Sequence, residues 1–295
     1  MALLVHELQQ LIPQKLLLDT VDGFFPRGSR ESPIDPANLR GRSYDATPAW
    51  PVLERLAECG LEGALKTDWM SILPGPDESL FPKACLGLII LLDQAPREVL
   101  SDGTNARYNF GFFDPIASHV VAKWKDLPPH LIPWNKHRWS DYHPDWWMFA
   151  TMWFMAPFTH SEILANHDYQ IGIWSWVKRD CEKEYGLQDP YAERLRAGGD
   201  LDADPCAFPR EAMRGPPWNS FAEWLYWWAM IFHVHRPILQ NFGRYPYRND
   251  ALGRSTTQTE ARWIEETKLF AASVEVAAGQ IREDVERGRW RPIQR

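Results

Sequence analysis

Three short segments combine acidic, imidazole or guanidinium side chains with apolar flanks, and these residue types can transfer protons or bind anions. The first follows the apolar run Leu86–Leu92 and places Asp93 four residues before Arg97. A buried carboxylate is costly without a partner, and residues at i and i+4 share a helical face. The pair therefore indicates either a structural ion pair at a helix end, or an acid, base or ligand-orienting role for Asp93.

The second segment, residues 157–162, contains His160 between Thr159 and Glu162. Thr159 and Glu162 fit a capping box that opens a long helix ending at Gly186. Because a helix N-terminus disfavours a protonated imidazole, His160 is expected to be neutral and able to act as a base or donor. The alternatives are a satisfied core histidine and a Glu162 that only caps the helix.

The third segment is the densest in basic residues and runs on turn-forming residues into a helix start near Thr257. Guanidinium groups recognise carboxylates and phosphates through paired donors, and a helix N-terminus also favours anions. Its candidates are His235, Arg236, Arg244, Tyr247, Arg248 and Arg254. The sequence leaves two interpretations open, anion binding and tethering of the loop to carboxylates of neighbouring helices.

We expect these segments to meet around one aromatic pocket, because the chain carries 16 tryptophans. Tryptophan provides apolar walls with a single polar contact point, although filling a core is its commoner use. The predicted acid–base residues are His160, His235, Asp93 and Glu162. The predicted substrate contacts are Arg97, Arg236, Arg244, Tyr247, Arg248 and Arg254, with Trp153 and Trp228 as walls.

Composition excludes several classes of protein. The net charge of −7 argues against a general nucleic-acid binder. The four cysteines are far apart in the sequence and form no CxxC pair, which favours a reducing compartment and a cytoplasmic location. The N-terminus lacks a signal-peptide pattern, and the longest apolar runs are too short to cross a membrane. No nucleotide, redox or metal motif occurs, so neither a cofactor nor a metal site is predicted.

Helix signals dominate the chain and predict one all-α domain over residues 1–295. Helix starts are expected at Thr47-Pro48, Asp114-Pro115 and Asp189-Pro190, and aromatic helices at 145–155, ending near Pro157, and at 219–239, interrupted at Pro237. A capping box at 257–260 predicts a helix that runs to Gly288 and includes Leu269, Phe270 and Val274. No run has the alternation of a strand, and no 34-residue repeat predicts a regular solenoid.

Two segments, at about 22–48 and 197–217, are rich in Pro, Gly and polar residues and are predicted to be irregular. Loops of this length often act as lids or binding loops, and surface insertions are the alternative.

Together the three segments resemble the all-α family catalogued as domain of unknown function 924, whose fold is related to tetratricopeptide-repeat proteins. The matching stretches are residues 92–94 with 96–97, 157–158 with 160–162, 235–236, 242–244, 248–249 and 252–256. The resemblance covers about Phe81 to Glu266 and implies an irregular multi-helix, tetratricopeptide-like α–α superhelix. Ala95, Glu98 and Tyr247 depart from the family pattern, which suggests a divergent, fungal member with a shifted pocket or specificity.

Three functions follow as hypotheses. The first is an enzyme that acts on a small anionic, partly apolar metabolite by cofactor-free cyclisation, isomerisation, elimination or hydrolysis, in a natural-product tailoring setting. A variant is a prenyl-diphosphate cyclase that requires Mg²⁺, with aromatic faces that stabilise carbocations. The third is a non-catalytic tetratricopeptide-type binding protein. The expected partner is the small anionic substrate, with no nucleic acid and no membrane, and a homodimer is left open.

Overall fold

Helices make up all the regular structure in the part of the chain that the structure describes. The computed structural model describes residues 3–40, 44–267 and 275–295, and these ranges contain α-helices, 3₁₀ turns and π-helical turns but no strand. The predicted all-α, multi-helix class is therefore confirmed. Within the same ranges, no helix has the length and apolar content needed to cross a lipid bilayer.

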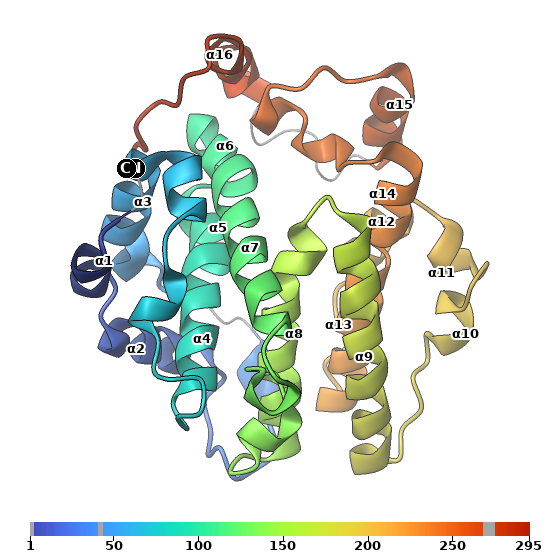
Figure 1. Ribbon diagram of the computed structural model, residues 1–295. Coiled ribbons are helices and arrows are strands. Elements are labelled where there is room, and N and C mark those ends of the chain that lie inside the picture. Colours follow the sequence, from blue (N-terminus) through green and yellow to red (C-terminus); the bar gives the residue numbers. More distant parts are fainter. Residues whose placement is uncertain (1–2, 41–43, 268–274) are drawn as a thin grey trace.

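The three N-terminal helices lie together on one side of the molecule (Figure 1). They are α1 (Val5–Leu11), α2 (Gln14–Phe24) and α3 (Trp50–Leu65). Helix α2 lies so close to α4 (Phe81–Ile89) that a Cβ atom at Gly87 would come within 2.2 Å of the carbonyl oxygen of Leu17. Glycine at this position therefore permits the backbone contact that joins the N-terminal helices to the core.

Two long helices each contain a π-helical turn. One consists of α4, η4 (Ile90–Gln94) and α5 (Ala95–Val99), and the other of α6 (Ala106–Tyr108), η6 (Asn109–Phe113) and α7 (Asp114–Lys125). In each π turn an N–H bonds the carbonyl five residues back, from Ala95 to Ile90 and from Asp114 to Asn109. The predicted helix start at Asp114 is therefore wrong, because the helix already runs through this residue.

The core surrounds α8 (Pro144–His160), which packs against α4, α7, α9 (Leu164–Tyr185) and α13 (Phe221–His233). Figure 1 shows these helices side by side. The side chains from Trp146 to Thr159 are buried except that of Trp153. A helix that is apolar all round is stable only when other helices cover every face, and this is the position of α8.

The turn from α8 to α9 differs from the prediction. Pro157 does not end α8, which continues to His160, and α9 begins only at Leu164. Thr159 therefore lies inside a helix, where its hydroxyl group bonds the carbonyl of Met155, and no capping box forms. The predicted stop at Gly186 is confirmed, because this residue ends α9 in the left-handed conformation at φ 65°.

The two segments predicted to be irregular have different structures. Between α2 and α3 the described residues form only short 3₁₀ turns, and the helix predicted from Thr47 begins at Trp50. The segment 197–217 contains two short helices, α11 (Asp200–Ala203) and α12 (Ala207–Arg214). Before it, Asp189 caps a turn by accepting the N–H of Tyr191, and α10 (Ala192–Leu195) follows.

The C-terminal helices cross one end of the molecule. They are α14 (Arg236–Phe242), α15 (Gln258–Thr267) and α16 (Glu275–Glu286). The break predicted at Pro237 falls just before α14, and Pro237 is its second residue. The capping box of α15 is confirmed, because Glu260 accepts the N–H of Thr257 at 2.7 Å and returns its own N–H to the Thr257 hydroxyl at 3.3 Å.

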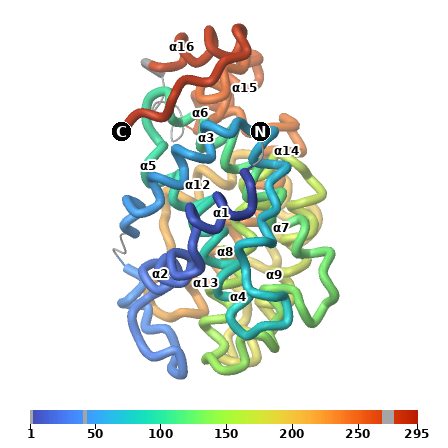
Figure 2. The backbone as a smooth tube through the Cα atoms, turned by 60° about the vertical axis from the view of Figure 1, so that its left-hand side comes forward, coloured from blue at the N-terminus to red at the C-terminus, as the bar shows by residue number. Residues whose placement is uncertain are grey.

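The helix predicted to run on to Gly288 crosses residues 268–274, with Leu269, Phe270 and Val274, which lie outside the described residues. Figure 2 shows the segment after α16 returning toward α3, where Arg295 pairs with Glu54 at 2.8 Å.

Candidate functional site

The structure brings Asp93 and His160 into direct contact. Asp93 lies in the π turn η4 with its side chain wholly buried, and His160 is the last residue of α8. The two are joined by a hydrogen bond of 2.8 Å between Asp93 Oδ1 and His160 Nδ1. Gln94 donates its side-chain N–H to the second oxygen, Oδ2. The carboxylate is thereby fixed, and it orients the imidazole ring.

The protonation of this pair follows from its neighbours. Burial raises the pKa of Asp93, but the charge of Arg97, the positive charge of His160 in its protonated form, and the hydrogen bonds from His160 and Gln94 outweigh burial and hold this pKa below its usual range. The carboxylate is therefore ionised at neutral pH, and the hydrogen bond assigns a proton to Nδ1 of His160. The other nitrogen, Nε2, makes no hydrogen bond to any described residue, and 21% of the side chain is exposed.

A second carboxylate, Asp114, lies between two guanidinium groups. Arg97 Nη2 lies 2.6 Å from Asp114 Oδ1, and Arg248 Nη1 lies 3.2 Å from Oδ2. Arg97 also donates to the carbonyl of Asp93, and Arg248 donates to the carbonyl of His160 at 2.8 Å. These bonds join η4, α7, α8 and the 3₁₀ turn η9 (Pro246–Arg248) in one buried network.

Arg248 is enclosed by aromatic rings. Its guanidinium carbon lies 4.5 Å from the ring centre of Tyr245, 4.8 Å from that of Phe110 and 5.6 Å from that of Tyr247. Only 3% of the Arg248 side chain is exposed. Cation–π contacts are strong where water is excluded, so these rings help to hold a charged group inside the protein. Tyr247, predicted to contact substrate, here packs against Arg248.

The other three arginines predicted to bind an anion already contact carboxylates. Arg254 binds both oxygens of Glu162 at 2.9 and 2.7 Å, and Arg244 binds both oxygens of Glu260 at 2.6 and 2.9 Å. The side chain of Arg236 lies 2.7 Å from Asp168, of which 58% is exposed. For Arg244 and Arg236 the geometry is that of a loop tied to neighbouring helices, which is the alternative that the sequence left open.

Glu162 has a different position from the one predicted. It lies in the link between α8 and α9, where it binds Arg254 and accepts the N–H of Tyr245 at 3.0 Å. Burial raises the pKa of Glu162, but the hydrogen bonds from Arg254 and Tyr245 outweigh burial and lower it. Its carboxylate is therefore ionised and anchored.

An open cleft of about 550 Å³ lies between α7 and the link from α8 to α9. Five members of the charged network line it, namely Asp114, His160, Glu162, Arg248 and Arg254. Three polar residues that the sequence did not single out, Ser118, His119 and Asn166, line it as well. Asn166 bonds the hydroxyls of Ser118 and Ser161 at 3.2 and 2.9 Å, so this wall of the cleft is itself fixed.

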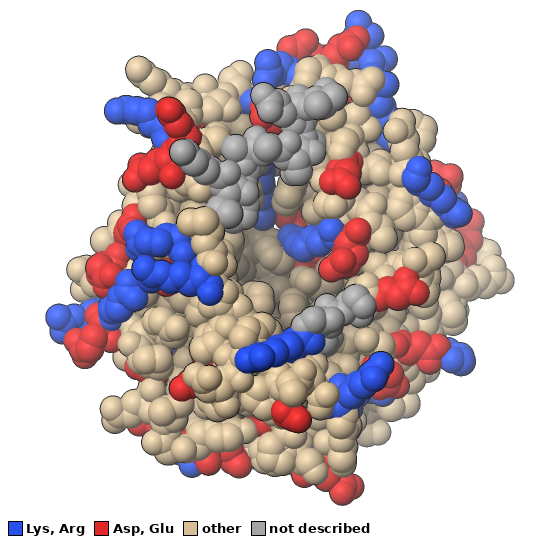
Figure 3. Space-filling model, turned by 180° about the vertical axis from the view of Figure 1, so that it is seen from behind, with Lys and Arg blue, Asp and Glu red and all other residues tan. Residues whose placement is uncertain are grey.

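The predicted tryptophan walls lie elsewhere. Trp153 and Trp228 contact each other, with ring centres 6.3 Å apart, but neither lines the cleft. Trp153 precedes His160 by seven residues, about two turns, so both project from the same face of α8. The buried indole nitrogens of Trp153 and Trp228 have no hydrogen-bond partner among the described residues. Figure 3 shows that the surface is hollowed on the back face, with Lys and Arg side chains near the hollow.

His235 does not join the site. It is 6% exposed, its Nδ1 lies 2.8 Å from the carbonyl oxygen of Ile231, and its ring centre is 3.7 Å from that of Phe208. Burial lowers its pKa well below the ordinary value. This geometry is that of a neutral core histidine.

Among the residues that the structure describes, one cluster of side chains could hold a metal ion. Ligand atoms of Asp93, Asp114 and His160 lie within 4.8 Å of one another. Both carboxylates already contact Arg97, and Arg248 is a second cation beside Asp114. A divalent cation would therefore have to compete with two guanidinium groups, and the residues present fit a metal poorly. The sequence predicted no metal site, and it missed Asp114 because Asp-Pro resembles a helix start.

Comparison with known proteins gives one match. The model of a family described as "Bacterial protein of unknown function (DUF924)" matches residues 64–268, which is 205 of the 295 residues. No curated protein matches the chain, and neither does any solved structure. The relation to tetratricopeptide folds and the fungal origin therefore stay predictions.

Proposed function

Because the chain belongs to the DUF924 family of bacterial proteins of unknown function, which brings no established reaction, we propose a function from the site itself. The protein is a small-molecule enzyme in which His160 acts as a general base toward an anionic, partly apolar metabolite. The observation that carries the proposal is an imidazole held at Nδ1 by a buried carboxylate, with Nε2 unbonded to the described residues, in a side chain that lines an open cleft.

The chemistry follows from the two nitrogens. In its neutral form the imidazole accepts a proton at Nε2, and the imidazolium that forms is stabilised by the ionised Asp93 at Nδ1. The same nitrogen then returns the proton at another atom of the substrate. Abstraction of a proton next to an acid group, with its return elsewhere or with loss of a leaving group, gives an isomerisation, a cyclisation or an elimination. His160 can perform each without a cofactor.

Substrate binding uses the rim of the same cleft. Arg254 is the most exposed cation there, with 30% of its side chain exposed, and its Nε atom makes no hydrogen bond to a described residue. It is therefore the group that receives the acidic part of the metabolite. Apolar lining from Leu65, Phe110 and Leu252 accommodates the remainder.

The test separates chemistry from folding. His160→Asn places an amide N–H where Nδ1 lies, so it keeps a donor for Asp93 and removes the base. We expect wild-type protein, incubated with a metabolite extract in D₂O, to introduce deuterium into specific compounds detected by mass spectrometry. His160→Asn should abolish this exchange and leave the melting temperature within a few degrees of wild type. Exchange at the wild-type rate by His160→Asn, or a variant that fails to fold, would refute the proposal.

A second candidate is a metal-dependent prenyl-diphosphate cyclase, which only the proximity of Asp93, Asp114 and His160 supports, because the pairing of both carboxylates with arginines fits a metal poorly. It requires that Mg²⁺ compete with Arg97 and Arg248. The measurement is Mg²⁺ titration calorimetry on wild type and on Asp114→Asn. Binding that Asp114→Asn abolishes would support the cyclase, and absence of binding would leave the metal-free enzyme.

The non-catalytic binding protein is less favoured. If the motif residues only tied helices together, none would present an unbonded polar atom to a cleft. His160 and Arg248 instead line one cleft, with the buried Asp93 bonded to His160 behind it, and His160 keeps Nε2 unbonded to the described residues. His235, which is buried and bonded to the carbonyl of Ile231, is a predicted acid–base residue that fits the non-catalytic alternative. A partner that binds this face and is unaffected by His160→Asn would revive it.

A further inference from the structure

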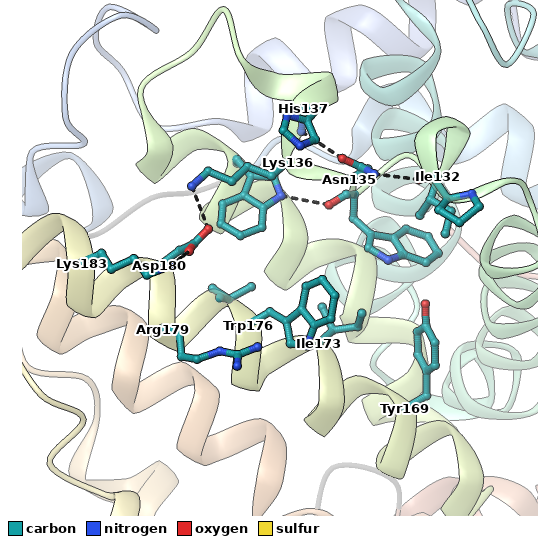
Figure 4. Close-up of a pocket in the computed structure, with 14 residues that line it drawn as sticks. Ile132, Asn135, Lys136, His137, Tyr169, Ile173, Trp176, Arg179, Asp180 and Lys183 are labelled. Carbon is teal, nitrogen blue, oxygen red and sulfur yellow. Dashed lines mark hydrogen bonds and ion pairs between the residues drawn. The ribbon is translucent and has the colours of Figure 1, made fainter.

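A second cleft, of about 580 Å³, lies on a different part of the surface from the His160 site. One side is the link between α7 and α8, which contains the 3₁₀ turns η7 (Pro129–Leu131) and η8 (Lys136–Trp139), and the other side is α9. Figure 4 shows side chains from these two sides facing each other across the opening. The volume is within the range of about 300–1,000 Å³ that is typical of small-ligand pockets.

Aromatic rings form the floor and one rim of this cleft. Trp134 and Trp147 are 5% and 6% exposed and are joined by a hydrogen bond of 2.9 Å from Trp147 Nε1 to the Trp134 carbonyl. Trp176 stands at the rim with 67% of its surface exposed. The exposed ring of Trp176 lines the same cleft as the buried rings of Trp134 and Trp147, which hydrogen bonding and packing hold in place. The cleft therefore offers flat apolar surfaces on two sides.

Positive charge gathers at the same opening, although the chain as a whole carries −7. Lys136 and Lys183 share one carboxylate, Asp180, at 2.8 and 3.5 Å. Arg179 has no carboxylate partner among the described residues, and its guanidinium carbon lies 5.8 Å from the ring centre of Trp176. Three cations against one anion leave a local excess of positive charge. An anion is therefore the complement of this cleft.

We propose that this cleft is a second ligand site, for a planar aromatic ring that carries a carboxylate or phosphate group. The ring inserts between Trp176 and the floor formed by Trp134 and Trp147, where stacking and burial of apolar surface stabilise it. The acidic group binds Arg179 through paired N–H donors, with Lys183 beside it. The site uses no residue of the His160 cleft, so it is independent of the proposed function.

Titration calorimetry on the 295-residue chain tests the proposal, with naphthoate and naphthyl phosphate as probes. We expect at least one of them to bind one site per chain, and comparison of the two identifies which acidic group fits. Naphthalenemethanol, which lacks the charge, and cyclohexanecarboxylate, which lacks the aromatic ring, should each bind at least about tenfold more weakly, corresponding to one charged contact or one stacked ring. Absence of heat with both acidic probes at millimolar concentration would overturn the proposal.

Variants locate the site. Arg179→Gln and Trp176→Ala alter exposed side chains of α9, and each should weaken binding by about tenfold or more. Met213→Ala is the matched control, because Met213 is also a large exposed side chain, at 65%, on a different helix. His160→Asn should leave the affinity unchanged. If Arg179→Gln and Trp176→Ala bind like wild type, or if His160→Asn abolishes binding, the ligand lies elsewhere and the proposal fails.

Discussion

Replacing Arg248 with methionine should destabilise the protein far more than the same replacement of Arg236. Both arginines belong to the basic segment that the sequence predicted to bind an anion. Arg248 is 3% exposed and contacts Asp114, which is also 3% exposed. Arg236 is 25% exposed, and its partner Asp168 is 58% exposed. The two substitutions therefore remove the same group from a buried pair and from a surface pair.

The magnitudes follow from these positions. Removing one member of a buried ion pair costs about 3–5 kcal/mol, because the other charge stays buried. The hydrogen bond from Arg248 to the carbonyl of His160 and the contacts with the surrounding rings act in the same direction, while Arg97 still pairs with Asp114. We expect Arg248→Met to lower the free energy of unfolding by about 4 kcal/mol. Arg236→Met should lower it by at most about 1 kcal/mol.

Urea unfolding followed by circular dichroism measures both values. A third variant, Arg248→Lys, retains the charge but presents a single ammonium group, which cannot reproduce the planar contacts with the rings. It should fall between wild type and Arg248→Met. Equal losses for Arg248→Met and Arg236→Met would refute the view that Arg248 is a buried structural cation.

Two further predictions concern pH and helix packing. Burial lowers the pKa of His167 to about 4, against about 6.5 in the unfolded chain. The unfolded chain therefore binds a proton more readily, so the contribution of neutral His167 to folding stability is fully present above pH 6.5 and is lost as the pH falls toward 4. The free energy of unfolding should fall by about 3 kcal/mol over this interval, and His167→Gln should reduce that slope in pH-dependent urea unfolding, whereas exposed His130→Gln should not. Gly87→Ala should destabilise the folded protein by at least about 3 kcal/mol, because the new Cβ atom collides with the backbone at Leu17. Gly172→Ala in α9 should instead stabilise the protein by up to about 1 kcal/mol, because open space surrounds the new Cβ atom and alanine favours a helix. A similar change in melting temperature for the two alanine variants would contradict the packing argument.

The sequence was most informative where a charged side chain lies in a buried helix, because such a group needs a partner of opposite charge. The apolar run before Asp93 predicted a buried carboxylate that needs a cation, and Arg97 lies beside it. His160 was interpreted as a base or donor, and the structure places it in contact with Asp93. His235 has the same side chain in an equally apolar segment, but its Nδ1 is satisfied by the carbonyl of Ile231. Periodicity alone does not distinguish these two histidines.

Prolines account for most of the misplaced helix boundaries. Pro96 and Pro115 each lie two residues after a π turn, inside helices that continue through them. Proline in a helix lacks an N–H and crowds the carbonyl one turn back, and a wide turn just before it accommodates both effects. Asp114 was therefore interpreted as a cap when it is the centre of the charged network. Pro157 likewise lies within α8, because the surrounding core holds that helix together.

The two π turns make the positions of the charged side chains sensitive to the deletion of a single residue. Each contains one residue more than a regular helical turn, and deleting that residue would rotate the side chains beyond it by about 100°. Such a deletion in η4 would turn Asp93 away from His160, and one in η6 would shift Asp114 relative to Arg97. If a related chain lacks one residue within either helix when it is aligned with this one, its charged network is arranged differently, even where every charged residue is retained.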